Sequence, residues 1–502
     1  MAAKPTTPAH FIDGEWVAPL EGGTREIRCP ADGSLVATVA EGSAADSEAA
    51  VAAARRAFDS GVWSFTPAVE RGALLLALAD RLEAEKEEVA RLEALDTGKR
   101  MVEARIDMDD IIGVFRHFGK LADADAGRVV DAGMGSVASR VVYEPVGVCS
   151  LISPWNYPLL QTSWKVAPAI AAGCAFIVKP SELTPSTSMW LVATLDDLGL
   201  PKGVGNLILG AGAAVGDPLT SDPRVDMVSF TGGLVTGKRI MASAAETVKK
   251  IALELGGKNP NVVFADADLP AAIDNALTAI FLDSGQVCSA GSRLIVEASI
   301  HDEVVDELVR RAEKIRLGGP FDERAETGPL ISAAHREKVE AYVAAGIAEG
   351  AVLRTGGTRP EAEQYQAGFY YLPTILDECR SGMSCVRDES FGPVLTVETF
   401  EGDDPDSVED AAVAIANDTH YGLAGAVWSQ DAGRAERVAR RLRHGTIWIN
   451  DYHPYVPQAE WGGFGQSGIG RELGVAGLEE YREAKHIWHN TRPAPAGWFD
   501  AD

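Results

Sequence analysis

The sequence has few cysteines, few histidines and no long apolar run. Its six cysteines include no CxxC pair, and its nine histidines include no HxxxH or HxH pair. So few thiols in 502 residues imply no disulfide framework and predict a reducing, cytoplasmic location. The histidine spacing indicates no metal site. The first residues, Met1–Thr6, lack the apolar run of a signal peptide.

Basic residues are also scarce relative to acidic ones. The 46 Lys and Arg face 73 Asp and Glu, which gives a formal charge of -27. This field opposes binding to nucleic acids and to anionic membranes. The longest nearly apolar stretch, 166–178, contains Pro168 and Gly173 and is short for a bilayer span. It predicts a buried helix followed by a buried strand.

The order of patterns along the chain predicts an α/β protein of two or three domains. Helical patterns cover 44–60, 71–93 and 107–123, and a β-hairpin is expected between 127 and 144. From Val146 strands and helices alternate, which predicts a parallel sheet that binds ligands at the carboxyl ends of its strands. The expected strands are 146–152, 175–179, 206–209 and 226–230, and the expected helices are 159–172 and 186–198. A second α/β segment runs from about 261 to 450, and a polar and aromatic tail covers 487–502.

Three turns follow the expected strands. Gly210–Gly216 has GxGxxxG spacing and no acidic residue placed to bind a ribose, so a turn into a helix is favoured over a phosphate loop. Phe230–Gly237 is a better phosphate candidate, because its glycines let backbone N–H groups face an anion. Lys179–Glu182 is typical of a solvated turn, but its Lys and Glu also suit a ribose, and the Glu disfavours a 2′-phosphate.

Three further segments carry reactive or polar side chains. Cys288 follows the Gly-rich segment 253–259 by about thirty residues, and a thiol near the carboxylate of Glu254 suggests covalent catalysis. Taken alone, such a Cys is more typical of a small buried hydrophobic residue. Asn156, between Pro154 and Pro158, suits either a turn or an oxyanion. Residues 389–393 are typical of a surface turn.

Together, and in this order, the segments resemble the aldehyde dehydrogenase superfamily over nearly the whole chain. The matching segments are Pro154-Trp155-Asn156, Lys179-Pro180-Ser181-Glu182, Phe230-Thr231-Gly232, Leu253-Glu254-Leu255-Gly256-Gly257-Lys258, Gln286-Val287-Cys288, Glu389-Ser390-Phe391-Gly392-Pro393 and Trp461-Gly462-Gly463-Phe464-Gly465-Gln466-Ser467-Gly468. The resemblance implies a Rossmann-type NAD-binding domain (1–125 and 146–255, completed by about 455–485) and an α/β catalytic domain (256–450). It also implies a small oligomerisation arm and tail (126–145 and 486–502), and hence a homodimer or homotetramer.

The resemblance also implies a role for each residue. Cys288 would be the nucleophile, Glu254 the general base and Asn156 an oxyanion donor, with an aldehyde oxidised to an acid through a thiohemiacetal and a thioester. NAD would be the cofactor. Its contacts would come from Trp155, Lys179, Ser181, Glu182, Phe230, Thr231, Gly232, Gly233, Gly237, Leu255, Glu389 and Phe391. Many relatives carry Ser where this chain has Gly233, so a side-chain bond to phosphate is expected to be missing.

Around the nucleophile the sequence is most similar to the betaine aldehyde dehydrogenase branch. Tyr157, Trp164, Tyr455 and Trp461 stand where that branch places aromatic walls, which suit a quaternary ammonium group. The substrate implied is betaine aldehyde, oxidised to glycine betaine. An ω-aminoaldehyde, a broad range of aldehydes, and a non-catalytic relative are the alternatives. Leu282 and Glu460 depart from the branch, and the sequence does not give the direction of Glu460.

Overall fold

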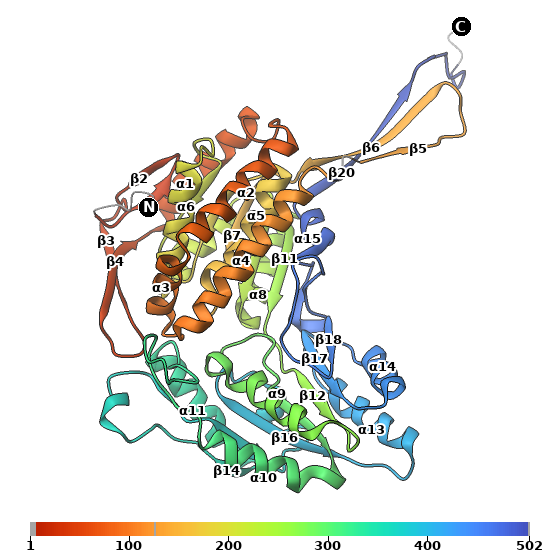
Figure 1. The fold of residues 1–502 in the computed structure, drawn as a ribbon. Coiled ribbons are helices and arrows are strands. Elements are labelled where there is room, and N and C mark those ends of the chain that lie inside the picture. The colour runs from red at the N-terminus through yellow and green to blue at the C-terminus, as the bar shows by residue number, and fades with distance from the viewer. Residues whose placement is uncertain (1–6, 125–126, 500–502) are drawn as a thin grey trace.

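The structure, a computed structural model, describes residues 7–124 and 127–499. Two large sheets with helices packed on them form the two halves of the body, and a narrow arm projects from it (Figure 1). The architecture is α/β, as the sequence predicts. Within the described ranges no helix is long and apolar enough to cross a membrane. Residues 1–6, 125–126 and 500–502 of the predicted domains lie outside the described residues.

The first sheet has eight strands in the order β19-β11-β10-β7-β8-β9-β1-β2, of which the five from β11 to β9 are parallel. Its strands are β1 (His10–Ile12), β2 (Glu15–Val17), β7 (Val148–Ile152), β8 (Ala175–Lys179), β9 (Gly205–Leu207), β10 (Met227–Gly232), β11 (Lys250–Leu255) and β19 (Gly468–Ile469). Its helices are α1 (Ala44–Ser60), α2 (Ala68–Ala84), α3 (Lys86–Thr97), α4 (Met101–Leu121), α5 (Pro158–Ala172), α6 (Ser186–Asp197), α7 (Asp217–Ser221), α8 (Leu234–Ala245) and α15 (Gly474–Glu479).

Alternate residues of the central strands enter two different cores. In β8, Phe176 and Val178 pack with α2, α5 and α6, whereas Ala175 and Ile177 pack with α1 on the other face. Because side chains alternate along a strand, a fully apolar strand must be covered on both faces. This explains why the run 166–178 folds as the buried helix α5 followed by the buried strand β8, as predicted.

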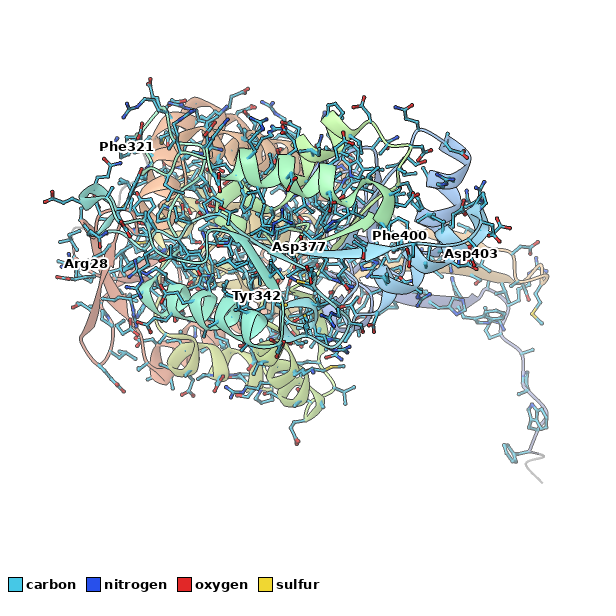
Figure 2. All side chains as sticks on the ribbon, turned by 90° about the horizontal axis from the view of Figure 1, so that it is seen from below. Arg28, Phe321, Tyr342, Asp377, Phe400 and Asp403 are labelled. Atoms are coloured by element: carbon cyan, nitrogen blue, oxygen red, sulfur yellow. The ribbon has the colours of Figure 1, made fainter. Side chains whose placement is uncertain are left out.

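The second sheet has seven strands in the order β14-β15-β16-β13-β12-β17-β18, and only β14 is antiparallel to its neighbour. Tyr342 on α11, with Asp377 and Phe400 at the ends of β15 and β16, marks this half in Figure 2. The strands are β12 (Pro260–Val263), β13 (Arg293–Glu297), β14 (Val352–Thr355), β15 (Thr374–Asp377), β16 (Val394–Phe400), β17 (Ala424–Trp428) and β18 (Thr446–Ile449). The helices are α9 (Leu269–Phe281), α10 (His301–Ala312), α11 (Ala333–Ala348), α12 (Ser384–Arg387), α13 (Pro405–Asn417) and α14 (Ala432–Arg441).

The arm is an antiparallel sheet in the order β20-β6-β5, formed by β5 (Arg128–Val130), β6 (Val137–Pro145) and β20 (Arg482–Asn490). The predicted hairpin is therefore present, and the start of the predicted tail is a strand paired along β6. Near the amino terminus β3 (Gly23–Arg28) and β4 (Leu35–Glu41) form a separate ribbon.

The helical segment expected over 71–93 is interrupted, which corrects the prediction. α2 ends at Ala84 and α3 begins at Lys86, and between them Glu85 leaves helical geometry with φ −105° and ψ 13°. The Glu85 carboxylate accepts a hydrogen bond of 2.8 Å from the indole of Trp190 on α6. This contact holds the turn at Glu85, where the chain leaves α2 and enters α3.

Candidate active site

Two hollows meet at Cys288, between the two halves of the body. The sheet-end hollow, about 830 Å³, is lined by residues at or just after the ends of β7, β10 and β11, together with Glu389 and Phe391. The helix-side hollow, about 1100 Å³, lies against α4, α5 and residues 452–455. Of the residues that the structure describes, only Gln161, Cys288 and Trp461 line both hollows. Such a position gives one thiol access to two different bound molecules.

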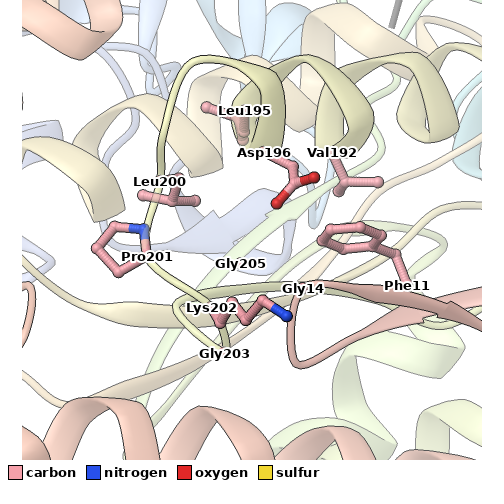
Figure 3. Close-up of a pocket in the computed structure, with 10 residues that line it drawn as sticks. All are labelled: Phe11, Gly14, Val192, Leu195, Asp196, Leu200, Pro201, Lys202, Gly203 and Gly205. Carbon is pink, nitrogen blue, oxygen red and sulfur yellow. The ribbon is translucent and has the colours of Figure 1, made fainter. Parts of the chain in front are cut away.

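A third hollow, about 240 Å³, lies beside Phe11 and Gly205 and is separate from Cys288 (Figure 3). Gly205 begins β9, so this hollow is at the amino end of the strand. Ligands of open α/β sheets bind at the carboxyl ends. We therefore assign no role to it.

The loop that carries Cys288 is held in an unusual conformation. Asp283 and Ser284 have positive φ values of 46° and 53°, and the Asn259 amide donates 2.9 Å bonds to the carbonyls of Cys288 and Ala290. Burial, with the fields of Glu254 and Glu389, raises the pKa of the Cys288 thiol to about 12. The resting sulfur is therefore protonated, and its attack requires a base.

Asn156 lies against this loop. Its buried Nδ2 donates a 2.8 Å hydrogen bond to the carbonyl of Gln286. A side-chain amide has two N–H donors, so one remains for another acceptor. The turn at Pro154 and the start of α5 at Pro158 place Asn156 beside Cys288, in the sheet-end hollow.

Glu254, near the end of β11, is buried and lines the same hollow. Burial and the nearby Glu472 raise the pKa of Glu254 well above its usual value, while Lys165 and Arg471 oppose the shift. A Cβ on Gly462 would lie 2.8 Å from a Glu254 carboxylate oxygen, so that glycine leaves room for the side chain. Once deprotonated, such a carboxylate is a strong proton acceptor.

Glu389 and Phe391 enter the sheet-end hollow from the second half. The Glu389 carboxylate accepts a 3.0 Å bond from the N–H of Gly257, and burial raises its pKa to about 7. Phe391 has a positive φ of 55°, and its ring packs edge-to-face on Trp155 at 5.3 Å. The surface turn that residues 389–393 suggest in isolation is therefore part of a hollow.

The predicted cofactor residues fall into three groups. Those that line the sheet-end hollow are Trp155, Thr231, Gly232, Gly233, Leu255, Glu389 and Phe391. Phe230 packs in the core beneath it, and Gly237 lets α8 approach Leu255, since a Cβ there would lie 2.6 Å from a Leu255 methyl. Lys179, Ser181 and Glu182 do not line it. Lys179 ends β8 and the other two residues follow it, and Lys179 Nζ lies 3.4 Å from Glu182 Oε2.

The four predicted substrate aromatics all line the helix-side hollow. Trp164 packs on Tyr455 at 5.4 Å and on Trp461 at 5.9 Å between ring centroids. Tyr157 is different, because the Lys99 ammonium lies 3.9 Å from the centroid of its ring. Three of the four rings therefore form one wall.

The sequence matches the profile of the aldehyde dehydrogenase family over residues 16–487. The chain belongs to the aldehyde dehydrogenase family. It is 55% identical to the betaine aldehyde dehydrogenase of Bacillus subtilis (strain 168), over 98% of this chain and 99% of that one. It is 43% identical to the peroxisomal aminoaldehyde dehydrogenase 2 of Malus domestica, over 97% of each. A crystal structure of Staphylococcus aureus betaine aldehyde dehydrogenase in complex with NAD+ superposes with a TM-score of 0.96 at 51% identity, covering 98% and 96% of the two chains. The predicted family and fold are confirmed.

In this aldehyde dehydrogenase, acidic residues that were not predicted from the sequence line one side of the helix-side hollow. Glu103, Asp107 and Asp110 of α4 line the hollow. Their spacing of four and three residues places them on one helical face, which is the signal that was available. Asp107 is paired with Lys99 at 2.7 Å, whereas Asp110 accepts a 3.0 Å bond from the Tyr455 hydroxyl. Burial raises the pKa of Asp110 to about 6.

Glu460 is directed toward α15. Its carboxylate lies at the start of α15, where a Cβ on Gly474 would be 2.5 Å from Oε1. Glu460 is exposed and does not line the helix-side hollow, whereas Leu282 does. Among the described residues, no group of three or more His, Cys, Asp and Glu side chains is arranged to hold a metal ion.

The sheet-end hollow fits a dinucleotide on its own geometry. The buried Thr231 hydroxyl has no hydrogen-bond partner in the described part of the chain. A Cβ on Gly233 would meet nothing within 4 Å, so the backbone at this start of α8 is open to an approaching anion.

Proposed function

We propose that this chain oxidises betaine aldehyde to glycine betaine with NAD. The observation that carries the proposal is the position of Cys288 between the sheet-end hollow and a hollow with aromatic and acidic walls. Ring faces and carboxylates both attract a cation that cannot donate hydrogen bonds, such as trimethylammonium. The similarity to betaine aldehyde dehydrogenases supports this choice of substrate.

The first step forms a carbon–sulfur bond. The Cys288 sulfur attacks the aldehyde carbon as its proton passes to a base, for which the nearby carboxylate of Glu254 is suited by its raised pKa. Negative charge develops on the aldehyde oxygen. The second N–H of the Asn156 amide and the backbone N–H of Cys288 would stabilise it, and the loss of one such donor costs about 3–4 kcal/mol in the barrier.

NAD, when bound, supplies the acceptor for the hydride that leaves the substrate carbon. Trp155, Thr231, Glu389 and Phe391 would hold it in the sheet-end hollow. A thioester then remains on Cys288. After releasing its first proton to solvent, Glu254 would take a proton from a water molecule whose oxygen attacks the thioester carbon. The carbon–sulfur bond then breaks, the acid leaves, and the proton on Glu254 returns to the Cys288 sulfur.

The activity is tested by adding betaine aldehyde and NAD to the purified protein and following absorbance of the reduced nicotinamide. We expect turnover by the wild type and none by Cys288→Ala. Full activity in Cys288→Ala would refute the mechanism. The absence of turnover in the wild type would favour a non-catalytic relative.

An ω-aminoaldehyde is the second candidate, since an aminoaldehyde dehydrogenase is also similar to this chain. A primary ammonium donates hydrogen bonds, so it would gain more from Asp110 than trimethylammonium does. Comparing kcat/KM for 4-aminobutyraldehyde and betaine aldehyde distinguishes the two.

We further propose that β5, β6 and β20 pair with a second copy of the chain. Val129, Val130 and Trp488 are exposed on this arm, and burying them would favour association. Light scattering on the intact protein tests this and distinguishes a dimer from a tetramer. A monomer at micromolar concentration would contradict it.

A further inference from the structure

The turn Gly210–Gly216 lacks an acidic partner nearby in the sequence, but the fold supplies one. After Gly210 the chain forms one π-helical turn and then α7, which confirms the predicted turn into a helix. The N–H of Ala211 donates a 3.0 Å bond to the carboxylate of Glu41, the last residue of β4. Because Glu41 is about 170 residues earlier in the chain, local spacing could not identify it.

Backbone hydrogen bonds hold the segment that carries Glu41 at the carboxyl edge of the first sheet. The N–H of Ile208 donates to Val178 in β8 at 3.0 Å, and the N–H of Gly42 donates to Leu209 at 2.9 Å. A Cβ on Gly42 would lie 2.7 Å from the Leu209 oxygen, so only glycine permits this approach. Glu41 is therefore held beside the end of β8, where Lys179 and Glu182 lie.

The charges at this edge interact. Arg25 on β3 donates two hydrogen bonds to the Glu41 carboxylate, one of 2.5 Å from Nε and one of 2.8 Å from a terminal nitrogen. Arg25 lowers the pKa of Glu41, so the side chain is a carboxylate at neutral pH. Burial lowers the pKa of Lys179, while the fields of Glu182 and Glu41 raise it and that of Arg25 opposes them. The charges of Arg25, Glu41, Lys179 and Glu182 are thus close enough to affect one another.

We propose that Glu41 is a second specificity-determining carboxylate at the adenosine ribose, which acts with Glu182 to select NAD over NADP. The inference rests on the proposed function, which requires a dinucleotide. A ribose 2′-hydroxyl can donate to a carboxylate, whereas a 2′-phosphate brings a charge of about −2 against it. Arg25, the cation that would suit the phosphate, is already paired with Glu41.

The test is calorimetric binding of NAD and of NADP to the intact protein without aldehyde. In Glu41→Gln we expect the Kd for NADP to fall about tenfold, because one repulsion is removed and Arg25 is released. The Kd for NAD should change less. Adding Arg25→Gln to that variant should reverse the gain. The matched control is Glu26→Gln, which removes the same charge from an exposed residue of β3 paired with Arg28.

Arg25→Gln alone gives an independent check with the opposite sign. It leaves Glu41 unpaired, so NADP should bind more weakly than to the wild type. An NADP-to-NAD affinity ratio in Glu41→Gln within about twofold of the wild-type ratio would overturn the proposal. So would equal gains in Glu41→Gln and Glu26→Gln. If Glu41→Gln fails to fold, an unchanged or improved NADP affinity in Arg25→Gln overturns it. A wild type that binds neither dinucleotide would instead refute the proposed function.

Discussion

The hydroxyl of Tyr455 donates a 3.0 Å hydrogen bond to Oδ2 of Asp110, so an aromatic ring and a carboxylate of the helix-side hollow are tied together. The two residues are 345 positions apart in the sequence. This pair joins the two features that attract a cation, a ring face and a negative charge. Under the proposed function, this pair would let α4 contribute to substrate choice.

Asp110→Asn should raise KM for betaine aldehyde by about fivefold and leave an uncharged aldehyde nearly unaffected, because only the cation loses an attraction. The control is Asp109→Asn, whose exposed carboxylate pairs with Lys86. Equal effects of the two substitutions would contradict this role for Asp110.

The raised pKa of Asp110 predicts that the preference for a cationic aldehyde depends on pH. The pKa of Asp110 is raised to about 6, so the group is charged above this pH and neutral below it. The preference for betaine aldehyde over an uncharged aldehyde should therefore decline as pH falls through about 6. Using the ratio cancels titrations that affect both substrates. The decline should be absent in Asp110→Asn.

Trp164→Leu should lower kcat/KM for betaine aldehyde by a factor of about 2 to 30, the value of one cation–π contact, and lower that for an uncharged aldehyde less. Trp164→Phe keeps a ring and is the matched control. Since Trp164 is buried, a thermal melt of each variant must show that the fold is intact. Identical losses on both substrates would indicate a purely steric wall.

Gly256→Ala should weaken NAD binding severalfold. A Cβ there would lie 2.0 Å from a Glu389 oxygen and would displace that carboxylate. Gly135→Ala, on the arm between β5 and β6, is the control, because its Cβ meets nothing within 4 Å. Binding measured without aldehyde checks the difference. Equal NAD affinity in the two variants would show that Glu389 does not contact the cofactor.

Glu254→Gln should lower kcat by a factor of about 100 or more, because general base catalysis contributes that much. Because Glu254 serves both the attack by Cys288 and the hydrolysis, formation of reduced nicotinamide in the first turnover should slow as well, which stopped-flow absorbance would detect. Glu472→Gln, which removes a buried carboxylate that raises the pKa of Glu254, is a useful comparison. A normal kcat in Glu254→Gln would remove the base from the mechanism.

The sequence predicted best those features that are encoded locally. The bounds of α1 were predicted to the residue, because Ser43 forms a capping box at its start and Gly61 ends it in the left-handed conformation. The hollow-lining residues 154–156 and 389–391 were found because their motifs follow one another in family order. The assigned roles of these residues stay predictions until the substitutions are made.

The features that could not be predicted depend on contacts between residues that are distant in the sequence. The carboxylates of α4 share a helical face, but the packing of α5 and residues 452–455 determines that this face lines a hollow. Glu41 comes beside the end of β8 only through the pairing of distant backbone segments. Glu460 directly precedes Trp461 of the aromatic wall in the sequence, yet its carboxylate lies at the start of α15.

Selection of a cation for attack by Cys288 can be measured as the ratio of kcat/KM for betaine aldehyde to that for 3,3-dimethylbutanal, an uncharged molecule of the same shape, with NAD at neutral pH. We predict a ratio of about ten or more, since the aromatic and acidic walls each contribute. A ratio of one or less would contradict the claim.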